Sequence, residues 1–411
     1  SAIGEGHHMY KINGRYYLIS TDYAPNGRTL CSRADNIWGP YETCVITADE
    51  TFGYHAAPGT RISGRIMPDG HPVSIAPADP DKTAASNIHQ GGIVSTPDGE
   101  WWALLMMDFH SIGRTTTLAP VTWVDGWPMI GLEGNLGRAP RTWLKPSTAA
   151  RDTVTPHAAY ERSDDFNGRE LKRIWQWNHN PDDKMWELRN GRLRLRTMPA
   201  EQLMWARNTL TQRVVGPVSI TTVELDVNHL KDGDVCGLGN INVPCSWTGI
   251  VKEGKETVLR CFEQVDNDTV DVPVKLSDGR IWLRFTGDFD NDKGRYSYST
   301  DGREFHQIGR EMTLSYQLIT FQGSRMSLFA FNKNGKNGGY AEFDNFTVEE
   351  PKADRTGYIP FGKTFRIINV ATGLPMHAMS HGLVYDTAKD NDSPQTRFRV
   401  LDRGNGKVVL Q

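Results

Sequence analysis

The stretch GIVSTPDGEWWALLM, residues 92–106, carries the local signal that decides the fold class. Two apolar runs flank Pro97-Asp98-Gly99, and this combination of residues is typical of a tight turn. Apolar runs on both sides of such a turn predict a β-hairpin. A second turn signal, Asn13-Gly14, precedes the run Tyr16-Tyr17-Leu18-Ile19 and predicts another hairpin. The N-terminal part of the chain is therefore predicted to consist of short antiparallel strands.

The composition agrees with a β protein. The chain of 411 residues contains 40 Gly, 22 Pro and 12 Trp. Glycine and proline interrupt regular structure, so their abundance favours short strands and turns over long helices. At about 100 to 200 residues per domain, the length allows two or three domains. We therefore expect an all-β protein of several domains.

The charge excludes two classes of function. Lys and Arg number 46 against 49 Asp and Glu, which gives a formal net charge of −3. Binding to nucleic acid or to an acidic membrane surface needs concentrated positive charge, and none is present. No run of about 18 apolar residues occurs, so no membrane span is expected. The first residues contain neither a basic nor an apolar segment, so no signal peptide is predicted.

Five cysteines are present, and none of them stands in a C-x-x-C spacing. Neither a zinc cluster nor a dense disulfide framework is therefore indicated. One disulfide at most is expected, with Cys236 and Cys245 as the candidate pair.

The pattern of apolar residues divides the chain into three parts. Residues 1–145 form the first β-rich part, and 146–163 form a linker that contains Pro, Ser, Thr and Ala. Residues 164–350 alternate apolar with polar side chains, as expected for half-buried antiparallel strands of a β-sandwich. The runs that carry this pattern are 193–196, 222–227, 281–285 and 296–299. Residues 355–411 are β-rich but few for an independent core.

Several motifs follow one another in order along the chain. In the first part they are Glu5-Gly6-His7-His8-Met9-Tyr10-Lys11, Asn13-Gly14-Arg15-Tyr16-Tyr17-Leu18, Trp38-Gly39-Pro40-Tyr41-Glu42, His89-Gln90-Gly91-Gly92-Ile93-Val94, Gly99-Glu100-Trp101-Trp102, Gly113-Arg114 and Val121-Thr122-Trp123-Val124-Asp125-Gly126-Trp127-Pro128. In the second part they are Trp175-Gln176-Trp177-Asn178-His179-Asn180-Pro181 and Ala206-Arg207-Asn208-Thr209-Leu210-Thr211-Gln212-Arg213. Together these motifs resemble glycoside hydrolase family 43, in its branch similar to β-xylosidases.

This resemblance implies a fold and an activity. The fold is a five-bladed β-propeller, whose N-terminal blades are absent from this chain, followed by a concanavalin-like β-sandwich. Residues 1–145 would hold about three blades at most. The activity implied is an inverting glycosidase that acts on xylo- or arabino-configured plant polysaccharides or oligosaccharides, as a β-xylosidase or an α-L-arabinofuranosidase.

The resemblance assigns Glu5 as the general acid. An inverting glycosidase needs a protonated carboxyl that protonates the leaving oxygen and a separate carboxylate that activates water. By the same resemblance, that base and a second Asp that tunes the acid would lie upstream of Ser1, and neither Asp22 nor Asp108 replaces them. The chain alone is therefore expected to be inactive or slow.

Three further residues match positions of the family. Arg114 matches an arginine that reaches the substrate pocket, against the alternative of a solvated arginine at a turn. His8 either contacts the same sugar or has a structural role. His89 matches a histidine near the propeller axis, where related enzymes hold calcium or its water; one ligand does not specify a metal, so calcium stays an expectation.

Other aromatic and acidic residues fit structural roles better. Most of the tryptophans in the first part are expected in the core rather than on a sugar, and Trp175, Trp177 and His179 are expected to hold the sandwich together. The segment Asp288-Phe289-Asp290-Asn291-Asp292 lacks the spacing of a calcium loop and is expected to be a solvated turn.

The sequence leaves a second function open, a non-catalytic carbohydrate-binding protein built from the same domains. Residues 365–373 resemble the first repeat of a ricin-type trefoil, which would make 355–411 a truncated carbohydrate-binding module. In either case the partner is a carbohydrate such as xylan or arabinoxylan. Because polysaccharides do not enter the cytoplasm, we expect a secreted or periplasmic protein, with a cytoplasmic enzyme for imported oligosaccharides as the alternative.

Overall fold

The computed structural model describes residues 5–21, 29–47, 61–62, 84–85, 88–133, 135–137, 139–140, 146, 161–315, 320, 322–351, 364–369, 371–379, 382–385, 393–402 and 408–411. Within these ranges the regular structure is β-strand, apart from short 3-10 helices. The all-β prediction is confirmed. No helix in the described residues is long and apolar enough to cross a membrane.

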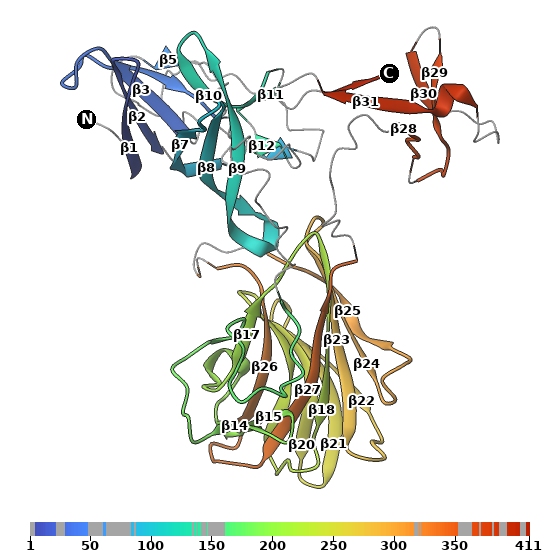
Figure 1. The fold of residues 1–411 in the computed structure, drawn as a ribbon. Coiled ribbons are helices and arrows are strands. Elements are labelled where there is room, and N and C mark those ends of the chain that lie inside the picture. The colour runs from blue at the N-terminus through green and yellow to red at the C-terminus, as the bar shows by residue number, and fades with distance from the viewer. Residues whose placement is uncertain are drawn as a thin grey trace.

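The first part contains two antiparallel sheets in which strands adjacent in sequence are adjacent in space, the form of propeller blades (Figure 1). The first sheet has the order β1-β2-β3-β4-β5. Its strands are β1 (Glu5–Ile12), β2 (Arg15–Thr21), β3 (Thr29–Ala34), β4 (Glu42–Val45) and β5 (Arg61–Ile62). The predicted turn between β1 and β2 is present, with φ of 49° at Asn13 and 84° at Gly14. Such positive φ values suit asparagine and glycine, which explains why this dipeptide closes the hairpin.

The second sheet has the order β11-β10-β9-β8-β7. Its elements are β7 (Ile88–Ser95), β8 (Trp101–Phe109), the 3-10 turn η1 (His110–Ile112), β9 (Gly113–Val124), β10 (Trp127–Leu132) and β11 (Asn135–Leu136). Two short strands, β6 (Ala84–Ala85) before this sheet in the sequence and β12 (Ala139–Pro140) after it, pair with each other. Residues 92–106 lie in the β7–β8 hairpin, as predicted.

The two sheets share one apolar core. Ile19 of β2, Ile88 of β7 and Trp127 of β10 are almost fully buried in it. Trp101 and Trp123 pack edge to face against each other, with ring centroids 5.2 Å apart, at the margin of the same core. These tryptophans therefore have the packing role that the sequence favours.

The second part is a sandwich of two large sheets, whose strand pairs are antiparallel except for the parallel pair β16–β26 (Figure 1). One sheet has the order β13-β17-β26-β19-β20-β21-β22, with β16 paired to β26. Its strands are β13 (Gln176–Trp177), β16 (Met198–Pro199), β17 (Leu210–Arg213), β19 (Asp234–Ile241), β20 (Ser246–Glu253), β21 (Glu256–Glu263), β22 (Asp268–Pro273) and β26 (Arg325–Asn332). The turn η3 (Leu203–Trp205) precedes β17.

The facing sheet has the order β14-β15-β27-β18-β23-β24-β25. Its strands are β14 (Trp186–Arg189), β15 (Arg192–Arg196), β18 (Val218–Asp226), β23 (Arg280–Asp288), β24 (Lys293–Ser299), β25 (His306–Thr313) and β27 (Tyr340–Glu349). Alternate residues enter the core between the sheets, such as Val223 and Leu225 of β18 and Leu283 of β23. The apolar residues of the alternating runs therefore form the core between the two sheets, as the sequence predicts.

The candidate disulfide is wrong. All five cysteines are buried and free, including Cys236 and Cys245. Cys236 lies in the core on β19, opposite Ile250 of β20 in the register. Burial raises the pKa of Cys245 to about 11 and that of Cys261 to about 12, which keeps both thiols protonated near neutral pH.

The C-terminal part contributes short strands. A three-stranded sheet consists of β28 (Thr364–Phe365), β31 (Phe398–Asp402) and β32 (Val408–Leu410), and a hairpin of β29 (Met376–Met379) and β30 (Gly382–Tyr385). The turn η4 (Pro394–Thr396) precedes β31. The trefoil interpretation of this part stays a prediction.

Candidate functional site

Two β-bulges lie against each other where the first strands of the two blade sheets meet. The register of β1 shifts between Glu5 and His8, and that of β7 shifts between His89 and Gly92. Bulges bend a strand and redirect its side chains, and they are frequent next to active sites. The bulges contain residues with positive φ, 66° at Gly6 and 50° at Gln90. A Cβ on Gly6 would lie 3.3 Å from Cα of Gln90, so the two backbones are in close contact.

Glu5 is oriented by Gln90. The side-chain amide Nε2 of Gln90 donates a hydrogen bond to Oε1 of Glu5. The backbone N–H of Gln90 donates to Oγ1 of Thr21 at 2.9 Å, and Thr21 is the register partner of Glu5 on β2. Gln90 therefore connects β7 to both strands beside it. The Glu5 side chain is otherwise exposed.

Tyr10 forms the second connection between β1 and β7. Its hydroxyl oxygen accepts a hydrogen bond from the backbone N–H of Ile93 at 2.9 Å. Burial raises the pKa of Tyr10, so the hydroxyl stays protonated at neutral pH. A Cβ on Gly92 would lie 2.1 Å from this hydroxyl and 3.1 Å from Nδ1 of His8. Only glycine leaves room here.

His8 lies beside this contact and is exposed. Its ring is stacked with that of Tyr10, with centroids 6.5 Å apart. The structure therefore brings Glu5, His8 and the 89–92 segment together at one end of β1 and β7. The sequence did not single out Gln90, Tyr10 or Gly92 for these roles, although each of them stands inside a quoted motif.

His89 is fully buried on β7, opposite Met106 of β8 in the register. Calcium prefers six to eight oxygen ligands, and an imidazole nitrogen is not one of them. Across the residues that the structure describes, no group of three or more His, Cys, Asp or Glu could hold a metal. The described residues alone therefore do not form a calcium site, and calcium near His89 stays a prediction.

Arg114 is the second residue of β9 and is half-buried. It lies two strands from β7 in the sheet, because the order there is β9-β8-β7. Its register partner is Asp108, whose side chain lies outside the described residues. Arg114 therefore lies in the same blade as His89.

A hollow of about 470 Å³ lies elsewhere, in the sandwich. Its lining comes from 161–172 and 345–350 and includes Asp164, Lys172 and Glu350. None of these residues belongs to β1 or β7, so this hollow is separate from the Glu5 region. Asp164 is already occupied there by hydrogen bonds from the Trp175 indole and the Phe166 N–H.

Residues 163–349 match the family model described as the beta xylosidase C-terminal concanavalin A-like domain. The sandwich is a family 43 C-terminal domain. The match covers both large sheets, from before β13 to the last residue of β27.

Similarity to curated proteins extends beyond the sandwich. A putative beta-xylosidase of Xylanibacter ruminicola is 30% identical over 319 residues, which make up 76% of this chain and 52% of that protein. A beta-xylosidase of Formosa agariphila is 30% identical over 380 residues, covering 84% of this chain and 60% of that protein. Because both alignments are longer than the sandwich, they include parts outside it. The resemblance to glycoside hydrolase family 43 is thereby confirmed.

A solved structure supports the same family 43 fold. A bifunctional GH43-CE protein of Bacteroides eggerthii superimposes with a TM-score of 0.64 and 30% sequence identity, over 88% of this chain and 42% of that chain. The chain spans 52% and 60% of the length of the two curated relatives.

Proposed function

We propose that this protein is an inverting glycoside hydrolase that removes xylose or arabinose units from plant-wall carbohydrate, with Glu5 as its general acid. The observation that carries the proposal is the pair of facing bulges. They place the Glu5 carboxyl beside the 89–92 segment, where it accepts a hydrogen bond from the Gln90 amide. Because these two relatives are named β-xylosidases, we expect xylose rather than arabinose to be the sugar released.

The geometry supports an acid role for Glu5. Gln90 donates its amide hydrogen to Oε1, so a proton on the carboxyl is favoured at Oε2, from which it can pass to the leaving oxygen of the sugar. His8 and Arg114 would hold sugar hydroxyls, since both carry N–H donors. An inverting enzyme also needs a carboxylate about 6.5–9.5 Å from the acid to activate water. The resemblance assigns that base to a segment that precedes Glu5.

Two further expectations accompany this proposal. We infer that the protein acts where polysaccharide is accessible, in a secreted or periplasmic location, with the cytoplasm as the alternative for imported oligosaccharides. Calcium near His89 would have a structural or electrostatic role and enters no step of the mechanism.

Leaving-group dependence tests the acid role. Nitrophenolate departs without protonation, whereas the sugar hydroxyl released from xylobiose needs a proton donor. In the natural protein that contains this chain, Glu5→Gln is expected to lower kcat/KM on xylobiose by roughly 10²–10⁴-fold. It should affect 4-nitrophenyl β-xyloside much less. Glu42→Gln, on the exposed start of β4, is the matched control and should leave both rates unchanged.

Two outcomes, the first and the third below, would contradict the proposal, and the second would decide between its two sugars. Equal losses on both substrates would remove Glu5 from the acid role. Faster turnover of nitrophenyl α-L-arabinofuranoside than of the xyloside would assign the arabinose alternative. Binding to xylan without turnover of any of these substrates, unchanged by Glu5→Gln, would support the non-catalytic carbohydrate-binding protein instead.

A further inference from the structure

The corner between β8 and β9 is anchored in the sandwich. This corner, residues 110–113, consists of η1 and Gly113 (Figure 1). The backbone N–H of Ser111 donates to Oδ1 of Asp292 at 2.9 Å, and its carbonyl accepts from the N–H of Ser324 at 2.7 Å. The Ser111 side chain is fully buried. The sandwich therefore satisfies both the backbone N–H and the backbone carbonyl of Ser111.

Two glycines bring the backbones of the corner and the sandwich into direct contact. A Cβ on Gly323 would lie 1.7 Å from the carbonyl oxygen of Ile112, and a Cβ on Gly113 would lie 2.5 Å from the N–H nitrogen of Gly323. Gly113 also has a φ of 83°, which favours glycine. Because the obstacles are backbone atoms, neither position can accept a side chain unless the two domains separate.

The Ile112 side chain extends the anchor into the sandwich core. It packs against the buried apolar residues between the two large sheets, and a Cβ on Gly216 would lie 2.7 Å from its Cδ1. Ile112 therefore occupies space that the sandwich leaves open at a glycine.

The acidic segment 288–292 is a turn, as expected, but it is only partly solvated because it serves this contact. The Asp288 carboxylate accepts the N–H groups of Asp290 and Asn291, each at 3.2 Å, and so holds the turn. Phe289 is fully buried, and the Asp292 carbonyl accepts the N–H of Leu314 at 2.8 Å. The carboxylate of Asp292 is thereby fixed where it meets Ser111.

The corner is also the point from which β9 begins, and Arg114 follows it directly. We propose that the sandwich positions Arg114 for its sugar, with Asp292, Ser324 and Gly323 holding the corner that fixes the start of β9. Asp292 is then a positioning residue that acts through Arg114 and does not touch substrate. The role of Arg114 rests on the proposed function, whereas the anchoring of the corner rests on the contacts alone.

A double-mutant cycle in the natural protein tests the coupling. Asp292→Ala removes the acceptor of the Ser111 N–H and should lower kcat/KM on xylobiose about tenfold, mainly through KM. Asp292→Asn keeps an oxygen acceptor and should stay within about twofold of wild type. In an Arg114→Ala background, Asp292→Ala should have no further effect. The same tenfold loss in that background would overturn the proposal.

Hydrogen exchange tests the anchor independently of activity. In Asp292→Ala the amide hydrogens of 111–116 should exchange at least about threefold faster than in wild type, with Asp292→Asn close to wild type. Asp268→Ala, at an exposed acid on the edge strand β22, is the control and should leave these amides unchanged. Unchanged exchange in Asp292→Ala would refute the anchor. An inactive wild type with altered exchange would refute the proposed function and leave the anchor in place.

Discussion

The hydroxyl oxygen of Tyr10 on β1 accepts the backbone N–H of Ile93 on β7 at 2.9 Å. This bond joins two sheets that share no strand, at the end where Glu5 and Gln90 also meet. A side chain therefore replaces the backbone hydrogen bonds that would join neighbouring strands within one sheet. The candidate site depends on this junction, because Glu5 and the 89–92 segment come from different sheets.

Replacement of Tyr10 by Phe should destabilise the junction. The substitution removes the acceptor and leaves the Ile93 N–H without its partner, which costs about 1–3 kcal/mol for a buried donor. Urea unfolding measures the change in the free energy of unfolding. Tyr16→Phe, at a half-buried tyrosine of the same sheet, is the control. Equal effects of the two substitutions would show that the Tyr10 hydroxyl has no special role.

Gly92→Ala should be more tolerable when the Tyr10 hydroxyl is absent. The new methyl group would lie 2.1 Å from that hydroxyl, so alanine clashes in wild type. In Tyr10→Phe the obstructing oxygen is gone, and the cost of Gly92→Ala should fall by about 0.5–3 kcal/mol, the usual coupling between residues in contact. Strictly additive losses in urea unfolding would contradict the contact.

Local patterns were enough to predict much of the fold. The hairpins at Asn13-Gly14 and Pro97-Asp98-Gly99 and the alternation in 281–285 are properties of adjacent residues, so the sequence alone reveals them. Contacts between distant segments leave no such trace. The packing of Gly113 on Gly323 depends on where two backbones meet, and neither glycine differs in sequence from a glycine at a turn.

The wrong disulfide prediction and the only partly correct prediction for 288–292 have the same cause. Cys236 and Cys245 are close in sequence, but the register of β19 with β20 sets Cys236 against Ile250. The acidic segment 288–292 has the composition of a solvated turn, yet it faces a corner from another domain. For the candidate site, the motifs supplied Glu5, His8 and His89, whereas the bulges that bring them together became visible only in the structure.

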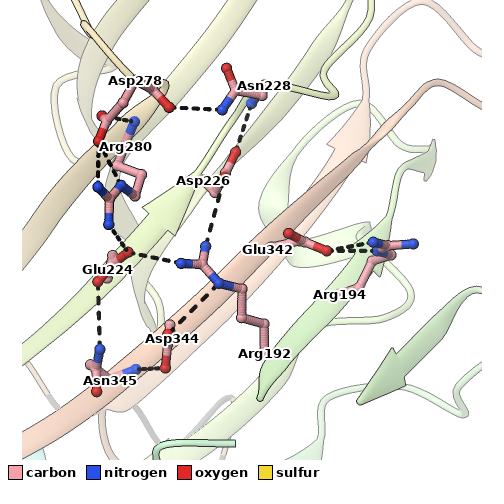
Figure 2. Close-up of polar contacts among 10 residues, drawn as sticks. All are labelled: Arg192, Arg194, Glu224, Asp226, Asn228, Asp278, Arg280, Glu342, Asp344 and Asn345. Carbon is pink, nitrogen blue, oxygen red and sulfur yellow. Dashed lines mark hydrogen bonds and ion pairs between the residues drawn. The ribbon is translucent and has the colours of Figure 1, made fainter. Parts of the chain in front are cut away.

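A charged network covers the outer face of the seven-stranded sheet, and Glu224 is its centre (Figure 2). Its side chain is only 8% exposed and accepts a hydrogen bond from Arg192 at 3.2 Å, with Arg280 at 3.5 Å. Glu224→Gln should lower the free energy of unfolding by about 1.5–3 kcal/mol, the range for hydrogen bonds to charged groups. Asp278→Asn removes an exposed partner of Arg280 and should change it far less. Equal losses in urea unfolding would contradict the central position of Glu224.

Asp301 should contribute stability that is lost in acid. Hydrogen bonds from the N–H groups of Arg303 and Glu304 and from the Ser299 hydroxyl lower its pKa to about 2. Since the folded state holds the carboxylate more strongly than the unfolded state, the contribution is complete above pH about 3.9 and fades as the pH falls through about 2. Asp301→Asn should therefore be less stable than wild type at pH 5, and the two curves should converge toward pH 2. Urea unfolding at each pH measures the free energy of unfolding of both proteins. A difference between them that stays constant with pH would refute this assignment.

Asp344 should show the opposite dependence. Burial raises its pKa, with the neighbouring Glu224 adding to the effect, although Arg192 and the N–H of Asn345 act against it. The folded state thus binds this proton more strongly than the unfolded state, so stability falls as the pH rises from the unfolded pKa of about 3.9 through the raised folded pKa.

Asp344→Asn tests this dependence. Asp344 accepts the N–H of Asn345 at 2.7 Å, and the substitution removes the buried charge but keeps an oxygen that can accept this N–H. The variant should be more stable than wild type at pH 7, and this gain should disappear below pH about 3.9, where both side chains are neutral. A variant less stable than wild type at pH 7 would mean that the ion pair with Arg192 outweighs the burial of the carboxylate.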